Sequence, residues 1–274
     1  KWVKFFSNLK FIVMDELHAS RGVFGSHVAS VIRRLLRIAK FYGSSPTFIF
    51  SSATIGNPQE LAEHYLERKV EMIEDNGAGS GEKILVCINP PIVDEVQGLR
   101  RSNALEAESA LLWLLQKGVR TILFSRSSLQ VELLAHYLNQ KLENPFNRNY
   151  GIVVKPYRSG LLPSERREIE RGLRNGTVHG VVSTNALELG IDIGGLDAAV
   201  ITGYPGSIAS FWQQAGRAGR TSGISLAIYV ASSSPLDQYF VAHPEYFLSR
   251  GAEQAHIDTY NPYLFTDHLK CAAF

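Results

Sequence analysis

The sequence is poor in the residues that hold small or metal-bound scaffolds together. It contains two cysteines in 274 residues, Cys87 and Cys271, and neither lies in a CxxC pair. This excludes a disulfide framework and a cysteine-ligated zinc site. No run of about 18 apolar residues is present, and Lys1 to Lys4 show no signal-peptide pattern, so we expect a soluble intracellular protein.

The chain also lacks a strong charge imbalance and the composition of a disordered protein. It is 45% hydrophobic with a net charge of +2, which excludes disorder, collagen and coiled coil. Residues 226–274 hold two basic and five acidic residues, which leaves +5 on residues 1–225. That basic bias would indicate a polyanionic partner only if other features agreed with it.

Short β-branched runs alternate with amphipathic stretches along most of the chain. This pattern is typical of an α/β fold, a parallel sheet flanked by helices. The predicted strands are 11–14, 47–50, 84–88, 120–124, 151–154, 178–183, 198–201 and 225–230. The predicted helices are 26–41, 59–67, 103–116, 128–140, 163–174 and 208–217.

A stretch with three glycines, residues 75–81, predicts a linker between two domains. We expect residues 1–81 to be the C-terminal part of one α/β domain and residues 82–250 to be a complete second one. Residues 251–274 are expected to form a tail that leads into a further region.

The first two predicted strands are each followed by polar residues. Asp15, Glu16 and His18 follow the first strand, and Ser52 and Thr54 follow the second. Open α/β sheets bind ligands at the carboxyl ends of their strands. There Asp15 can hold a Mg²⁺ ion that bridges nucleotide phosphates, and Glu16 can deprotonate an attacking water; a solvated acidic loop is the alternative. The hydroxyl groups of Ser52 and Thr54 can bridge neighbouring loops by hydrogen bonds, although a lone Ser-Ala-Thr tripeptide is more often part of a turn.

The most specific pattern is QQAGRAGR at residues 213–220. Arg217 and Arg220 are three apart, so on a helical turn they would lie on one face and could clamp the charge on a transferred phosphoryl group. A solvated helix end with a capping glycine is the alternative. The preceding Phe211 and Trp212 could stack on a base, but anchoring the helix in the core is the safer interpretation.

A further strand, predicted at 178–183, is followed by Thr184 and Asn185, and then by Gly190 and Asp192. Hydroxyl groups and helix amides at such a strand end can hold a backbone phosphate, and Asp192 can accept a hydrogen bond from a ribose hydroxyl. Thr184 and Asn185 could also be ordinary helix N-caps, and the two roles are compatible.

In their order, these motifs resemble motifs II, III, V and VI of the superfamily 2 DExH/DEAD-type helicases. They are DELH, SAT, STNALELGIDIG and QQAGRAGR, with motif IV at 123–127 and an accompanying strand-end motif at 157–160. The resemblance covers roughly residues 9–232. The stretches RGVFGSHV at 21–28 and GYPGS at 203–207 are similar to the DNA-repair helicases that carry a C-terminal four-cysteine zinc module.

The resemblance implies two RecA-like lobes and an enzyme, an ATP- and Mg²⁺-dependent DNA helicase that moves 3′ to 5′ and acts in DNA repair. The implied partner is DNA, as a single strand or a fork, with RNA as an alternative and no membrane. The implied location is the cytoplasm, at the nucleoid of a bacterium, or otherwise intracellular. Two other functions stay open: a nucleic-acid-binding module without catalysis, and an ATP-driven translocase or RNA helicase that does not unwind DNA.

The resemblance also assigns roles to residues. Asp15 would bind Mg²⁺, Glu16 would be the catalytic base, and Arg220 would be the arginine finger with Arg217 as its partner. One set would bind ATP or couple its hydrolysis to movement: His18, Ser52, Thr54, Gly190, Asp192 and Gln213. Another set would face the nucleic-acid backbone: Arg126, Ser127, Arg158, Thr184 and Asn185.

The sequence departs from the family in one respect, because it contains no GxxxxGKS/T loop, the motif I that holds the β- and γ-phosphates. The nearest stretch, residues 77–83, has Glu82 in place of the second glycine and precedes a predicted strand. We therefore expect the chain alone to be inactive and to be a fragment that works with the motif I region and the C-terminal module of the same protein. Native loss of the loop is the alternative.

Overall fold

The structure is a computed structural model that describes residues 2–53, 55–75, 77, 81–143, 151–188, 193–219, 223–249 and 251–273. It divides into two compact units. Unit 1 comprises residues 1–76 and 251–274, and unit 2 comprises residues 77–250. Across the described ranges, none of the helices combines the length and the apolar character that crossing a membrane requires.

Unit 1 is built on two parallel strands, β1 (Phe11–Met14) and β2 (Thr47–Phe50), which coincide with the predicted ones. Its helices are α1 (Trp2–Ser7), the 3₁₀ turn η1 (Leu17–Ala19), α2 (Gly22–Phe41), α3 (Pro58–Leu66) and α10 (Pro262–Ala273). Leu17, Leu61 and Tyr65 are almost fully buried between these elements. Burial of such side chains is the main source of stability for a unit with so small a sheet.

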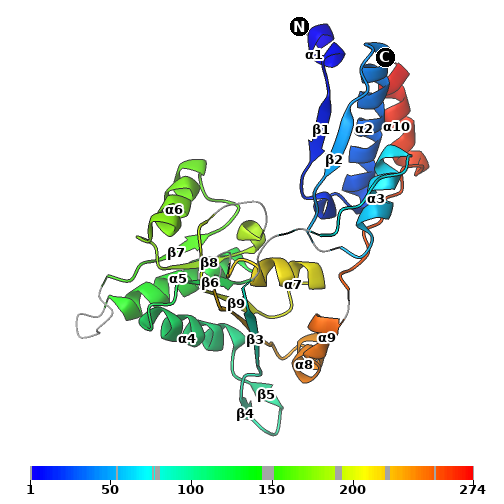
Figure 1. The fold of residues 1–274 in the computed structure, drawn as a ribbon. Helices are drawn as coiled ribbons and strands as arrows, with labels where there is room; N and C mark the ends of the chain where they lie inside the picture. The colour runs from blue at the N-terminus through cyan, green and yellow to red at the C-terminus, as the bar shows by residue number, and fades with distance from the viewer. Residues whose placement is uncertain are drawn as a thin grey trace. The chain divides into compact units, whose positions relative to one another are not determined.

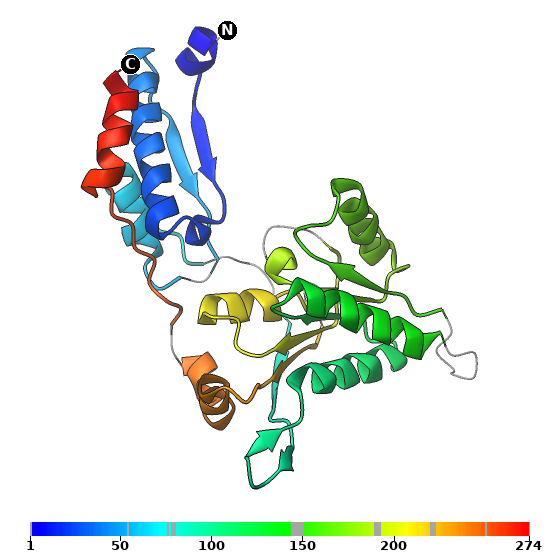
Figure 2. The same ribbon diagram turned by 180° about the vertical axis from the view of Figure 1, so that it is seen from behind.

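Residues 251–274, set apart as a tail by the sequence, pack onto unit 1, where α10 lies beside α2 (Figures 1 and 2). The Asn57 side chain pairs with the Ala255 backbone in both directions: its Oδ1 accepts the N–H at 2.8 Å and its Nδ2 donates to the carbonyl at 3.1 Å. The pairing joins residues far apart in sequence, so no local pattern indicates it.

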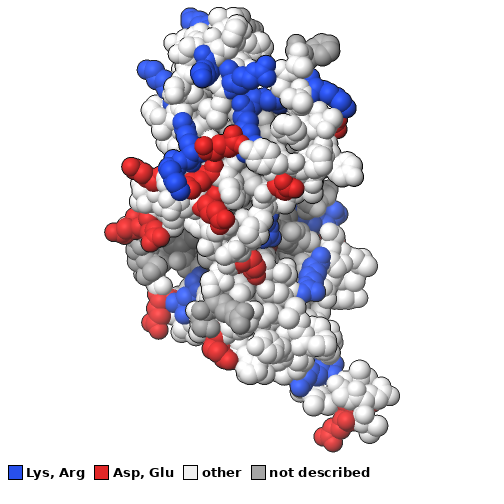
Figure 3. Space-filling model, turned by 90° about the vertical axis from the view of Figure 1, so that its right-hand side faces the viewer, with Lys and Arg blue, Asp and Glu red and all other residues white. Residues whose placement is uncertain are grey.

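Lys and Arg side chains gather on the face of unit 1 displayed in Figure 3. Two arginines of α2 also hold the returning segment. Arg33 donates to the Thr259 hydroxyl at 3.0 Å and pairs with Glu67 at 2.9 Å, and Arg37 donates to the Ala272 carbonyl at 3.0 Å. The basic face of α2 therefore serves partly to anchor α10 and the chain that leads to it.

Unit 2 contains a six-stranded parallel sheet with the strand order β3-β10-β9-β6-β8-β7. The strands are β3 (Lys83–Ile88), β10 (Ser225–Val230), β9 (Ala198–Thr202), β6 (Thr121–Phe124), β8 (Gly180–Ser183) and β7 (Val154–Tyr157). A small antiparallel hairpin, β4 (Ile92–Asp94) and β5 (Leu99–Arg100), follows β3 and was not predicted. The parallel sheet confirms the predicted α/β class.

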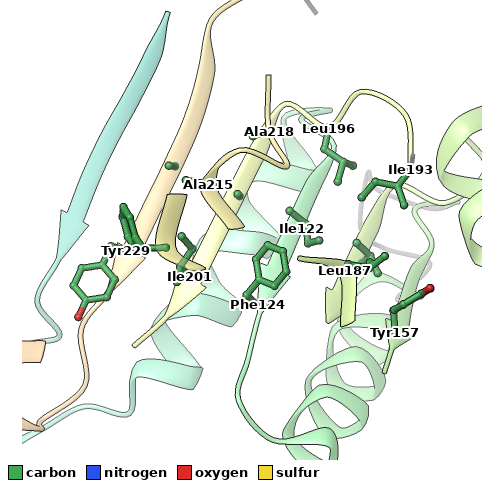
Figure 4. Packing of buried hydrophobic residues seen from close by; sticks show 14 of the residues in the cluster. Ile122, Phe124, Tyr157, Leu187, Ile193, Leu196, Ile201, Ala215, Ala218 and Tyr229 are labelled. Carbon is green, nitrogen blue, oxygen red and sulfur yellow. The ribbon is translucent and has the colours of Figure 1, made fainter. Parts of the chain in front are cut away.

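Helices cover both faces of this sheet. Alternate residues of a strand point to opposite faces, so Leu123 packs with α4 (Asn103–Gln116) and α5 (Ser128–Leu142), whereas Ile122 packs in the cluster on the other face. That second cluster, shown in Figure 4, includes residues of α6 (Pro163–Asn175), α7 (Ile208–Ala215), α8 (Pro235–Ala242) and α9 (Glu245–Ser249). Because both faces are covered, the inner strands β10, β9, β6 and β8 are mostly apolar, whereas the edge strand β7 contains the exposed Lys155.

The predicted bounds of β7 were wrong. We predicted a strand at 151–154, but β7 spans Val154–Tyr157 and includes Pro156. A proline cannot donate to a strand neighbour, which argues against a central strand but is tolerated at an edge. β7 is the edge strand next to β8, so the missing N–H of Pro156 costs no ladder bond on its outer side.

Phe211 and Trp212 belong to the core of unit 2. The Phe211 ring is fully buried and stacks on Phe247 with ring centroids 4.1 Å apart. The indole N–H of Trp212 donates to the Phe247 carbonyl at 2.9 Å. Of the two interpretations of this pair, core anchoring is therefore the one that the structure supports.

Replacing Phe211 by alanine should destabilise unit 2 by about 3–5 kcal/mol, because the substitution leaves a cavity in the aromatic cluster. Trp113→Ala on α4, where the side chain is 58% exposed, is the matched control and should cost about 0.5 kcal/mol or less. Native-state hydrogen exchange of the β10 amides measures both. Equal losses for the two variants would contradict the core role of Phe211.

Candidate functional site

The parallel register of β1 and β2 places the residues that follow them side by side. Met14 is paired with Phe50, so Asp15 and Ser51 are neighbours at the carboxyl edge. The Ser51 hydroxyl donates to the Asp15 carboxylate, and the Glu16 N–H donates to the same oxygen at 2.9 Å. These two hydrogen bonds lower the pKa of Asp15, the Ser51 bond most, so the exposed carboxylate is ionised at neutral pH.

Glu16 has a left-handed backbone, with φ 55° and ψ 45°. Among the described residues other than glycine, Glu67 is the only further one with positive φ, and it ends helix α3, where this conformation is common. Glu16 instead follows a strand and precedes η1, at a cost on the order of 1 kcal/mol. Such strain beside an ionised carboxylate at a strand end is typical of a functional site.

His18 connects the turn after β1 to the turn after β2. It is 7% exposed, and its Nδ1 accepts the Ala53 N–H at 3.2 Å, which places the proton of a neutral ring on Nε2. The Glu16 carboxylate lies 3.5 Å from the same Nδ1. The hydroxyl of Ser52 bonds to its neighbour Ala53, so Ser51, and not Ser52, bridges the two turns.

The acidic pair fits a magnesium ion that arrives with a nucleotide. Within the described ranges there is no group of three or more His, Cys, Asp or Glu side chains able to hold a metal, which argues against an all-protein metal cage there. Mg²⁺ is usually bound by one or two carboxylates, phosphate oxygens and waters. Asp15, ionised and exposed, supplies the kind of ligand that this arrangement needs.

In unit 2, four neighbouring strands end at one edge of the sheet. The last residues of β6, β8 and β7 are in register, because Phe124 is paired with Ser183 and Ser183 with Tyr157. β9 extends one residue beyond Ile201, the partner of Phe124. The residues that follow these strands include Tyr204, Arg126, Thr184 and Arg158. The structure therefore brings the predicted nucleic-acid-binding residues to a common edge.

Two of these residues, Arg126 and Asn185, line one hollow of ≈ 160 Å³ together with Ser125, Thr202 and Gln214. Arg126 is exposed, and its Nη2 donates to the Tyr204 carbonyl. Gln214, 5% exposed, donates to the Glu188 carboxylate at 3.0 Å. The polar lining of the hollow thus consists of an arginine, two amides and two hydroxyl groups, which suits an anionic oxygen ligand.

The hydroxyls of Ser127 and Thr184 cap helices. Ser127 Oγ accepts the Gln130 N–H at 3.5 Å at the start of α5, and Thr184 Oγ1 accepts the Ala186 N–H at 3.3 Å at the start of η2 (Asn185–Leu187). The capping role considered for Thr184 is therefore present. Ser127 is exposed and can also reach a ligand, whereas Thr184 is 7% exposed.

Arg158 already has an ionic partner. Its Nε donates to Glu132 Oε1 at 2.7 Å, with the two side chains 32% and 41% exposed. Sequence reasoning missed Glu132, which lies on α5 and is adjacent to Arg158 only because β7 and α5 pack together. A nucleic-acid phosphate would have to compete with this carboxylate for the guanidinium.

The helix predicted at 208–217 ends earlier than expected. α7 stops at Ala215, and Gly219 has φ +81°, so Arg217 lies outside the helix and the predicted helical turn does not carry it. Arg217 is 5% exposed, and its Nε donates to the Glu188 carbonyl at 3.1 Å. Gly219 lies against Ser225, where an added Cβ would overlap the Ser225 side chain, so its positive φ and this close approach both require glycine.

Gln213 lies half-buried on α7. The other predicted nucleotide ligands, Thr54, Gly190, Asp192 and Arg220, lie outside the described residues. Most of the predicted linker, 75–81, does so as well. The geometry of the second half of the nucleotide site thus stays a prediction from the sequence.

Comparisons with known proteins relate the chain to ATP-dependent helicases. Residues 104–222 match the family described as helicase conserved C-terminal domain. The whole chain is 54% identical to the uncharacterized ATP-dependent helicase YprA of Bacillus subtilis and covers 36% of it. It is 39% identical over 278 aligned residues to the ATP-dependent helicase hrq1 of Schizosaccharomyces pombe and covers 26% of that protein. The chain therefore spans well under half the length of these relatives.

Solved structures show the same likeness. Crystal structures of the DUF1998 helicase MrfA bound to DNA, and to DNA with AMPPNP, match 99% of the chain at 54% identity with a TM-score of 0.93. The chain covers 36% and 37% of them. The helicase Lhr of Mycobacterium smegmatis, bound to ssDNA and AMP-PNP, has a TM-score of 0.80 at 23% identity and shares the fold; 99% of this chain and 35% of Lhr are covered.

Ser51→Ala should raise the pKa of Asp15 toward its ordinary value, because the hydroxyl is the main group that lowers it. A lowered folded-state pKa stabilises the fold above the unfolded pKa, and this contribution is lost as the pH falls through the folded value. The variant should therefore lose part of this contribution, which the wild type has at neutral pH and loses in acid. A carboxyl carbon NMR titration measures the shift, with Glu63, whose pKa Lys69 lowers, as the internal control. An unchanged pKa of Asp15 would refute the assignment.

Proposed function

The chain belongs to the superfamily 2 helicases, and on this premise we propose that it is part of the motor of an ATP-dependent DNA helicase. The observation that carries the proposal is two strand-end groups of residues with different chemistry: the adjacent acids Asp15 and Glu16 after β1, and an arginine-bearing edge after β6 and β7. The first suits Mg²⁺ and nucleotide phosphates, and the second suits a nucleic-acid backbone.

In unit 1, Asp15 would hold Mg²⁺, which would neutralise charge on the nucleotide phosphates when bound. The Ser51 hydroxyl, by its hydrogen bond, lowers the pKa of the Asp15 carboxylate. Glu16 would accept the proton of the attacking water. Its left-handed backbone sets the direction in which the side chain leaves the main chain. His18 would transmit changes at this site through its bond to Ala53.

Unit 2 carries further residues with proposed roles in ATP binding and hydrolysis. By resemblance to the family, Arg220 would stabilise the transferred phosphoryl group, and Gly190, Asp192 and Gln213 would contact the nucleotide. Arg217 would act less directly, since its guanidinium holds the Glu188 carbonyl. Ser52 and Thr54 would couple the site to movement, as motif III does in the family.

Arg126, Ser127, Arg158, Thr184 and Asn185 would bind backbone phosphates of a single strand or fork. Such contacts are largely blind to sequence and weaken with salt. Translocation from 3′ to 5′ and a role in DNA repair follow from the resemblance. The MrfA structures bound to DNA support DNA as the partner, and RNA is the alternative that a direct comparison decides.

Glu16→Gln in the natural full-length protein should reduce the kcat of nucleic-acid-stimulated ATP hydrolysis by about 10²–10⁴-fold, because the amide cannot take the proton. ATP binding should persist. Glu60→Gln on α3 is the matched control and should hydrolyse ATP normally. ATPase and strand-displacement assays with DNA and RNA side by side measure the effect.

Other outcomes of this experiment would exclude parts of the proposal. Wild-type turnover by Glu16→Gln would remove the residue from the catalytic role. A natural protein that binds DNA but hydrolyses no ATP would be a non-catalytic binding module, and hydrolysis without strand displacement would indicate a translocase.

Glu132→Gln should strengthen single-stranded DNA binding by up to about 5-fold, because Arg158 no longer shares its charge; exposed ion pairs are worth about 1 kcal/mol or less. Glu168→Gln on α6, an exposed site, makes the same change in net charge and is the control. Fluorescence anisotropy gives both affinities. An equal gain in the two variants would show that net charge alone is responsible.

A further inference from the structure

The backbone of Tyr204 is held on both sides of its Cα. Its N–H donates to Asp237 Oδ1 at 3.0 Å, and its carbonyl accepts the Arg126 guanidinium. The Tyr204 ring packs on Phe240 of α8 with centroids 4.3 Å apart. One residue thus connects a buried carboxylate to an exposed arginine at the edge of the sheet.

Asp237 is 1% exposed and lies in the first turn of α8. Besides Tyr204, it accepts the Ser232 N–H at Oδ2 with a distance of 2.7 Å, and its own N–H donates to Ser234 Oγ at 3.2 Å. Burial acts to raise the pKa of Asp237, but hydrogen bonds from Ser232 and Tyr204 outweigh it and hold the pKa below its usual value. The buried group is therefore an anion that joins the segments after β9 and β10.

The segment that leads to Tyr204 packs closely against the Asp237 carboxylate. Gly203 has φ +72°, and a Cβ there would lie 3.1 Å from Asp237 Oδ2. Any other residue would meet both a strained backbone and the carboxylate. Capping of α8 does not require this anion, because Ser234 already caps the helix.

We propose that Asp237 is a positioning residue for nucleic-acid binding: by fixing the backbone of Tyr204, it sets where the Arg126 guanidinium lies at the hollow that Asn185 also lines. The inference rests on the proposed function of Arg126. Asp237 is buried and would act only through Arg126. Its effect passes through the two peptide groups that flank the Tyr204 Cα, so loss of the carboxylate should misplace the arginine.

Asp237→Asn in the natural full-length protein tests this. The amide keeps the shape, but its NH₂ cannot accept, so one buried N–H loses its partner. Single-stranded DNA affinity should fall about 10-fold. The slope of log affinity against log salt should become shallower by about 1, as expected for Arg126→Ala. The double variant should be no worse than Arg126→Ala alone.

The matched control is Asp197→Asn. Asp197 also accepts a backbone N–H, that of Arg120 at 3.1 Å, but it lies just before β9, at the opposite end of the strand from Tyr204. The Asp197→Asn variant should keep the wild-type affinity for single-stranded DNA and the wild-type salt slope. If Asp237→Asn does not fold, as judged by circular dichroism, Gly203→Ala carries the same test, because it displaces the carboxylate that it meets.

Two results would overturn the inference alone. One is a wild-type affinity of Asp237→Asn for single-stranded DNA. The other is a loss of affinity that leaves the salt slope unchanged and that adds to the loss caused by Arg126→Ala, which is the result expected if Asp237 has only a structural role. Wild-type affinity and slope for Arg126→Ala would instead overturn the proposed function of Arg126, and the inference with it.

Discussion

The candidate site depends on parallel, in-register strand pairing. Because the six strands of the main sheet of unit 2 all run in one direction, the residues that follow them emerge at a single edge, and residues separated by tens of positions in sequence become neighbours in space. The pair Asp15 and Ser51 arises in the same way from β1 and β2. A slip of one residue in either sheet would turn these side chains toward the opposite face and separate them.

A second constraint is the supply of N–H donors at these strand ends. Asp15 accepts the N–H of Glu16, and Asp237 accepts the N–H groups of Tyr204 and Ser232. Backbone donors favour the ionised carboxylate, and they also fix its position because the backbone itself is held by the sheet. Each unit therefore has a carboxylate with a lowered pKa at the strand-end edge of its sheet, the exposed Asp15 in unit 1 and the buried Asp237 in unit 2.

Sequence reasoning predicted this fold where local patterns determine it. The strands at 11–14, 47–50 and 225–230 coincide with the structure because continuous apolar runs ended by polar residues leave one interpretation. It misplaced β7, whose Pro156 is tolerated only at an edge that topology alone reveals. The packing of 251–274 on unit 1 and the partners Glu132 and Asp237 depend on tertiary contacts, which carry no local signal.

The three arginines of the site show why residue type alone does not determine role. Arg217 is buried against the Glu188 carbonyl, Arg158 is shared with Glu132, and Arg126 is exposed with the Tyr204 carbonyl as its hinge. A guanidinium has five N–H donors in a rigid fork, so one carbonyl can orient it and still leave donors for a phosphate. A carboxylate partner also offsets the charge. On this ground Arg126 has the strongest claim to the backbone contact, and the groups that orient it matter as much as its own charge.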